Sequence, residues 1–140
     1  MSTETEALAG PLQALLDEPG VTDVLVNGPR EVWVDRGRGL EPAGLDLGDA
    51  ARVRALAVRL AAAGGTRLDD ACPVADARLP NGVRLHAVLP PLAAGCTAIS
   101  LRVPRRRPFT LAELVERGTV PRGLEHVLRA LVARRANLLV

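Results

Sequence analysis

With 140 residues, the chain is long enough for one domain with a hydrophobic core but hardly for two. Its net charge of +2 is modest, and Trp33 and Phe109 are its only aromatic residues, which argues against nonspecific DNA binding and against base stacking. All 18 of its basic residues are arginine, so it holds no P-loop lysine, Schiff-base lysine or lysine general base.

The two cysteines and the N-terminus bear on compartment and on metal binding. Cys72 and Cys96 lack CxxC spacing and a neighbouring histidine pair, so we expect no metal site and interpret both as small buried apolar residues. Residues 1–9 are polar, are expected to be flexible, and lack the charge and apolar run of a signal peptide. The sequence therefore predicts a cytoplasmic protein.

The first half of the chain predicts a short helix followed by a β-meander. Gly10 and Pro11 can begin the helix, with Leu12, Leu15 and Leu16 on one face, and residues 18–20 end it. Alternating apolar residues then predict strands over 22–27 and 31–35, with a short third strand near residue 40.

A helix and three further strands are expected next. Asp49 is a good N-cap for a helix that ends at the glycines 64 and 65. Residues 74–79, 83–89 and 97–103 each alternate apolar and polar side chains, and a tight-turn signal at 80–82 joins the first two. Each of these strands carries arginine on its non-core face: Arg78, Arg84 and Arg102.

The C-terminal part predicts two helices and the start of a strand. Residues 104–108 form a basic loop, and Thr110 with Glu113 has the spacing of a capping box for a helix ending at Gly118. Residues 122–135 predict another helix, and 137–140 resemble the beginning of a buried strand. The arginines 105–107 either bind an anionic partner or belong to a solvated loop.

The count of elements predicts an α+β fold. We expect a mostly antiparallel sheet of five to six strands with helices packed on one face. The last twenty or so residues are interpreted as the opening of another domain.

Seven stretches, taken in order over roughly residues 8–140, carry a family resemblance. They read VTDVLVNGP (21–29), VWV (32–34), DARLPNGVR (76–84), PP (90–91), ISLR (99–102), TLAELV (110–115) and ARRANLLV (133–140). As an ordered set they resemble the type II/type IV secretion ATPase superfamily, and most closely its CpaF/TadA-like ATPases of tight-adherence pili and conjugal transfer. Residue 83 departs from the family, which usually has serine there. The chain also ends before any GxxxxGK[ST] motif.

The resemblance implies a domain organisation and a set of partners. Residues 10–118 would form a PAS-like N-terminal domain, and 119–140 a linker helix with the first strand of a truncated RecA-like ATPase domain. The full-length protein would be a homo-hexamer that uses ATP and Mg²⁺ and works with inner-membrane secretion or pilus platform proteins. It would lie in the cytoplasm, peripheral to the inner face of the cytoplasmic membrane, without specific nucleic-acid binding. This chain alone would bind no cofactor strongly and would not hydrolyse ATP.

The resemblance also implies a role for the three strand arginines. In this family, arginines of the N-terminal domain reach the phosphates of ATP, and the matching positions here are Arg84, Arg102 and Arg78. A guanidinium stays charged and presents a planar fork of donors to phosphate oxygens. On the pattern alone, outward arginines of this kind are more often solvated sheet-face residues, and Asp76 is a candidate ion-pair partner for Arg78 or Arg84. We expect His86 to be a sheet-face residue without a catalytic role.

Two other functions compete with the motor-ATPase interpretation. One is a stand-alone PAS-like adaptor or ligand-binding module of a secretion platform. The other, a small basic nucleic-acid-binding protein, rests only on the isoelectric point and the arginine run, and no known nucleic-acid-binding motif supports it.

Overall fold

The computed structural model describes residues 8–105 and 107–139. The chain divides into two compact units, Met1–Pro104 and Arg105–Val140, which are described separately below. The domain boundary expected between residues 118 and 119 comes from the family resemblance and stays a prediction. The expectation of a flexible segment over residues 1–9 falls mostly outside the described residues.

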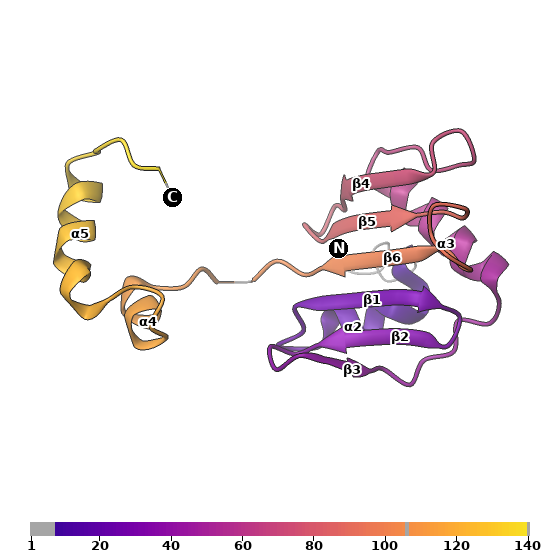
Figure 1. The fold of residues 1–140 in the computed structure, drawn as a ribbon, viewed down its shortest axis with the longest axis horizontal. Helices are drawn as coiled ribbons and strands as arrows, with labels where there is room; N and C mark the ends of the chain where they lie inside the picture. Colours follow the sequence, from indigo (N-terminus) through magenta and orange to yellow (C-terminus); the bar gives the residue numbers. More distant parts are fainter. Residues whose placement is uncertain (1–7, 106, 140) are drawn as a thin grey trace. The chain divides into compact units, whose positions relative to one another are not determined.

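The first unit is built on a six-stranded sheet with the order β3-β2-β1-β6-β5-β4 (Figure 1). All five strand pairings are antiparallel. The sheet therefore places β1 and β6 side by side at its centre although most of the unit's sequence separates them. The strand bounds are Asp23–Gly28 for β1, Glu31–Asp35 for β2, Leu40–Pro42 for β3, Val74–Arg78 for β4, Arg84–Val88 for β5 and Ala98–Arg102 for β6.

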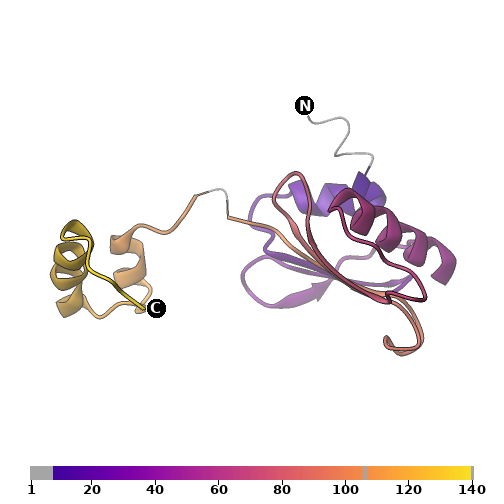
Figure 2. The same cartoon turned by 90° about the horizontal axis from the view of Figure 1, so that it is seen from above.

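The helices of this unit cover one face of the sheet, as the turned view shows (Figure 2). They are the 3₁₀ turn η1 (Gly10–Leu12), α2 (Gln13–Asp17) and α3 (Ala50–Ala63). Alternation along each strand sends every second side chain under these helices, which builds a core of aliphatic residues. The largest fully buried side chains are Leu12, Val24, Val26, Val34, Val53, Leu60, Leu85, Leu89 and Leu101. The predicted α+β class, the antiparallel sheet and the one-sided helices are confirmed.

Helix α3 lies close to the edge strand β4 because of how it ends. Asp49 caps its start, with the carboxylate accepting a hydrogen bond from the Arg52 amide at 2.8 Å. At its end, a Cβ added to Gly64 would lie 2.5 Å from the Cβ of Ala77 on β4. Only glycine permits this approach of helix to strand.

A tight turn fixes β4 against β5. The Asn81 side chain accepts a hydrogen bond from the amide of Val83 at 3.1 Å, and the Gly82 amide donates to the carbonyl of Leu79 at 2.8 Å. Gly82 has a φ of +85°, a conformation that side chains other than glycine rarely adopt. This turn places the end of β4 and the start of β5 in register.

The second unit contains α4 (Leu111–Glu116), the 3₁₀ turn η2 (Arg122–Leu124) and α5 (Glu125–Ala133). The predicted capping box is present: the Thr110 hydroxyl accepts from the Glu113 amide, and the Glu113 carboxylate accepts from the Thr110 amide at 2.7 Å. Ahead of it, the guanidinium carbons of Arg105 and Arg117 lie 3.9 and 4.6 Å from the centre of the Phe109 ring. These cation–π contacts tie the loop to the helix.

Two expectations differ from the structure. Residues 137–139 form no hydrogen-bonded strand, because the described residues of this unit include no strand with which they could pair; Val140 lies outside the description. Cys72 is exposed in the loop before β4 rather than buried, since the turn built on Asp69 carries it outward, whereas Cys96 is half-buried. Within the described residues, no helix combines the length and apolarity needed to cross a membrane.

Candidate functional site

Charged residues cross the face of the sheet that α2 and α3 leave uncovered, here called the outer face. The strand register places Arg78, Arg84 and Arg102 directly opposite one another on β4, β5 and β6. The same line continues to Asp23 on β1 and Asp35 on β2. We call these five residues the charged row. Its basic half lies on the β4 side of the sheet and its acidic half on the β2 side.

The basic half of the charged row is an electrostatically costly arrangement. Side chains directly opposite one another on antiparallel strands have Cβ atoms about 5 Å apart, and like charges at such positions repel. Arg84 faces an arginine on each side. An anion bound over this line would reduce that repulsion.

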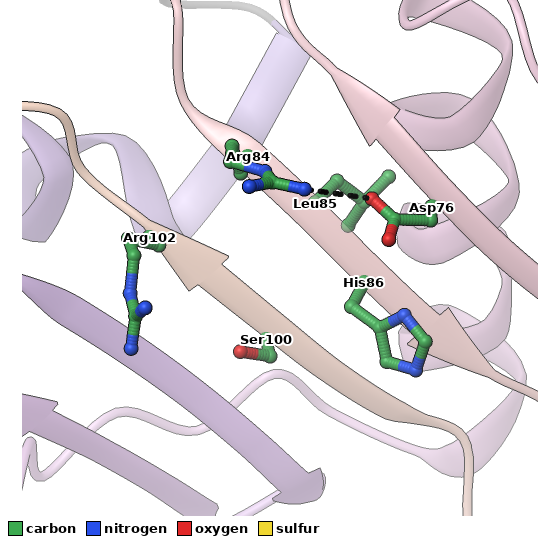
Figure 3. Close-up of a pocket in the computed structure, with 6 residues that line it drawn as sticks. All are labelled: Asp76, Arg84, Leu85, His86, Ser100 and Arg102. Carbon is green, nitrogen blue, oxygen red and sulfur yellow. Dashed lines mark ion pairs between the residues drawn. The ribbon is translucent and has the colours of Figure 1, made fainter. Parts of the chain in front are cut away.

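Two carboxylates offset part of this charge. The Nε of Arg102 donates to Oδ1 of Asp23 at 2.9 Å, an ion pair between the neighbouring strands β6 and β1. Arg84 lies diagonally opposite Asp76, with 3.9 Å between Nη2 and Oδ1, too far for a hydrogen bond (Figure 3). The side chains of Arg84 and Arg102 remain 63% and 73% exposed, so their donors stay accessible.

The outer face is hollowed between these side chains. The hollow has a volume of about 410 Å³, with buried Leu85 at its floor and Arg84 and Arg102 at one side. Its other lining residues are Asp76, His86 and Ser100, which form a second row parallel to the first. In Figure 3 the hydroxyl of Ser100 points toward the Arg102 side, and the imidazole of His86 lies on the other side of Ser100.

The structure brings two of the three predicted arginines together at the hollow. Arg84 and Arg102 both line the hollow, whereas Arg78 lies next in the charged row at the sheet edge, outside the lining. Asp76 pairs with Arg84, one of the two partners that sequence reasoning allowed it. Sequence reasoning missed Asp23 and Ser100, because their places depend on the long-range pairing of β6 with β1 and β5. Local alternation carries no signal of that pairing.

In the basic loop over residues 104–108, the two described arginines, Arg105 and Arg107, already have partners within the second unit. Arg107 pairs with Glu113 of α4, and Arg105 stacks on Phe109, while Arg106 lies outside the described residues. The hydrogen bonds from Thr110, together with the nearby Arg107, hold the pKa of Glu113 below its ordinary value. Over residues 8–105 and 107–139, no group of three or more His, Cys, Asp or Glu side chains is placed to hold a metal ion.

A comparison with protein families decides the assignment. The family model described as "Type II/IV secretion system protein" matches residues 5–140. The chain belongs to this family. Within it, the match covers the sheet with its charged row and extends through the second unit.

Relatives in the secretion family come from several bacteria. A putative conjugal transfer protein of Mycobacterium tuberculosis is 44% identical over 138 residues, covering 94% of this chain and 39% of that protein. The type IV secretion system protein VirB11 of Brucella suis is 31% identical over 109 residues, covering 77% of this chain and 30% of that protein. The chain thus spans well under half of the length of these relatives.

The fold has a counterpart among solved structures. The crystal structure of the VirB11 ATPase from the Brucella suis type IV secretion system, described as a complex with sulphate, superposes with a TM-score of 0.68 at 28% identity. The match covers 89% of this chain and 41% of that one. The α+β architecture is therefore that of the N-terminal region of a type II/IV secretion ATPase.

Proposed function

We propose that this chain is the ring-forming, nucleotide-clamping N-terminal domain of a hexameric secretion or pilus-assembly ATPase. In this role Arg84 and Arg102 contact the phosphates of ATP held by the ATPase domain, and Arg78 assists from the sheet edge. The observation that carries the proposal is the placement of Arg84 and Arg102 directly opposite each other, exposed, over one hollow. The relatives named as conjugal transfer and type IV secretion proteins support the wider assignment.

The chemistry follows from the charge of the phosphates. Guanidinium groups bind phosphate oxygens through paired N–H donors, and they stabilise the negative charge that shifts between phosphates during transfer. The register of two adjacent strands fixes the positions from which both arginine side chains start, without ordering a loop. Because the same contact forms only when a terminal phosphate is present, it can couple hydrolysis to movement of the domain.

The remaining assignments follow the family. The longer protein would belong to the CpaF/TadA-like branch, assemble as a homo-hexamer and bind ATP with Mg²⁺ through its ATPase domain. It would work in the cytoplasm with platform proteins at the inner face of the membrane, moving pilin or other substrates across it. Residues 10–118 would form the PAS-like domain of that protein and 119–140 the linker and first strand of the ATPase domain. The 140-residue chain alone should show no ATP turnover above background.

The test is substitution in the full gene product that contains this chain. We expect R84A and R102A each to lower the ATP turnover rate, on the order of a hundredfold, as for the loss of one transition-state donor. R54A is the matched control, because Arg54 also pairs with an aspartate, Asp70 at 2.8 Å, but on helix α3 away from the outer face. Unchanged turnover in both R84A and R102A would refute the clamp and favour a stand-alone adaptor or ligand-binding module of a secretion platform.

A further inference from the structure

We propose that His86 and Ser100 are phosphate ligands beside Arg84 and Arg102, and that His86 takes up a proton when a phosphate dianion binds. This inference rests on the proposed function and deepens it, because it names two further ligands and the charge state of the anion. From the sequence, His86 was expected to be a sheet-face residue without a catalytic role. The register of β5 with β6 places it opposite Ser100 and beside the two arginines, which suggests the role as a ligand.

The two rows of the outer face place four donors around one hollow. His86 lies directly opposite Ser100, and each lies two residues along its strand from Arg84 and Arg102 respectively. Residues two apart point to the same face of a sheet and are separated by about 6.7 Å, while neighbouring strands lie about 4.8 Å apart. All four line the same hollow (Figure 3). A phosphate group above the hollow is therefore within reach of both strands.

The residue types supply complementary donors. Each arginine offers a fork of N–H groups, Ser100 offers one hydroxyl proton, and a protonated imidazole offers an N–H together with positive charge. Ser100 is half-buried between its neighbours, and His86 is exposed at the opening. The site thus combines fixed positive charge with one cationic group whose charge depends on pH.

The charges around His86 determine whether anion binding favours or disfavours proton uptake by its ring. Across β4 it faces Asp76, on its own strand it has Arg84, and across β6 it faces Ser100 with Arg102 diagonally beyond. Asp76 places negative charge beside the ring, and the two arginines place positive charge beside it. A bound dianion cancels the arginine charge and adds an attraction of its own. Anion binding should therefore draw a proton onto His86.

The ligand class is a phosphate dianion, free or at the end of a nucleotide. A doubly negative group matches two arginines and one imidazolium whose charge Asp76 and Asp23 partly offset. A singly charged anion would be attracted less strongly by the His86 imidazolium than a dianion. Inorganic phosphate and ATP share the dianionic group, so the two sources must be separated by experiment.

The chain provides its own internal control for the test. His86 and His126 are its only histidines, and His126 lies in α5 of the second unit. The two ring signals of the 140-residue chain are followed by NMR against pH, with and without inorganic phosphate at constant ionic strength. We expect the pH of half-protonation of His86 to rise by about one unit with phosphate, while that of His126 stays unchanged. A His86 titration unaffected by phosphate, or an equal change at both rings, would overturn the proposal.

Two substitutions distinguish the loss of a phosphate contact from a general disturbance of the fold. H86Q and S100A should each weaken phosphate binding about threefold, the size expected for one exposed polar contact. The H86Q effect should be larger at pH 6 than at pH 8, whereas the S100A effect should be the same at both. Both variants should keep the wild-type amide spectrum away from the hollow. Full phosphate affinity in both variants would contradict the proposal.

Repeating the titration with ATP distinguishes the two sources of the anion. A response to ATP at lower concentration than to phosphate identifies the nucleotide as the ligand, and an equal response identifies phosphate itself. The outcomes also remain distinct from those of the proposed function. If R84A abolishes phosphate binding but H86Q and S100A do not alter it, only this inference fails. If R84A and R102A leave ATP turnover unchanged, the clamp fails whatever His86 does.

Discussion

Asp23 forms an ion pair with Arg102 of the neighbouring strand, with 2.9 Å between Oδ1 and Nε, although the two residues are 79 positions apart in sequence. Asp23 is the more enclosed partner, 23% exposed against 73% for the arginine. The pair orients the guanidinium over the outer face and at the same time neutralises it. In the proposed clamp, Asp23 would therefore compete with a bound anion for Arg102.

Substitution of Asp23 should reveal this competition. D23N removes the charge but keeps the shape, so we expect phosphate to bind about threefold more tightly to the 140-residue chain. D46N is the matched control, because Asp46 pairs with Arg30 at 2.9 Å elsewhere in the same unit. Phosphate titration followed by the amide spectrum measures both. Equal affinity in D23N and wild type would show that Arg102 is not limited by its ion pair.

Gly64 should tolerate no side chain. G64A places a Cβ 2.5 Å from the Cβ of Ala77, so α3 must move away from β4. We expect a loss of about 1–3 kcal/mol in the free energy of unfolding, the range for overpacking. G28A provides the control, since its Cβ would meet only the Glu31 side chain at 3.7 Å. Urea unfolding of both variants gives the comparison, and equal stability would contradict the close approach.

Leu85 should support the site from beneath. Its side chain is 1% exposed between the two polar residues that line the hollow, Arg84 and His86. L85A should lower the free energy of unfolding by about 2–5 kcal/mol through lost burial and the cavity left behind. L40A makes the same chemical change at a side chain that is 53% exposed and should cost far less. Similar unfolding midpoints for the two variants would argue against the assigned core.

The capping box should make α4 sensitive to acid. Hydrogen bonds from Thr110, with Arg107 nearby, lower the pKa of Glu113 in the folded chain from its ordinary 4.5. A lowered pKa stabilises the helix above pH 4.5, and that stabilisation is lost as the pH falls toward the folded value. Hydrogen exchange at the Leu114 amide, which donates to the Thr110 carbonyl at 3.1 Å, measures it. Exchange should speed up below pH 4.5 relative to its intrinsic rate.

Two variants separate charge from capping in that measurement. E113Q keeps side-chain acceptor capacity but cannot titrate, so its protection should no longer change with pH over this range. T110A removes the hydroxyl cap and should lower protection at every pH, by about 1 kcal/mol. Retention of the acid response in E113Q would assign it to another group.

Most of the fold could be predicted because the pattern is local. The predicted strand over 31–35 coincides with β2, and the others agree with β1, β4, β5 and β6 to within a residue at either end. Asp49 and Thr110 cap helices as their spacing indicated. These features depend on alternation and on capping, which a short stretch of sequence encodes.

What the sequence left open depends on contacts between distant segments. The pairing of β1 with β6 decides that Asp23 meets Arg102, and the pairing of β5 with β6 decides that His86 meets Ser100. Neither follows from alternation, which sets the face of a side chain but not its neighbours. The same dependence on distant contacts applies to residues 137–139, because an apolar run forms a strand only when another strand pairs with it.

Arg102 is also the last residue of β6, and the two compact units divide two residues later, between Pro104 and Arg105. The next residue, Val103, is anchored by its amide, which donates at 2.8 Å to the carbonyl of Thr22, the residue directly before β1. Any tension along the backbone between the units therefore passes through the end of the strand that carries this arginine. In the proposed clamp, the phosphate contact at Arg102 would therefore lie within three residues, along the chain, of the boundary between the two units.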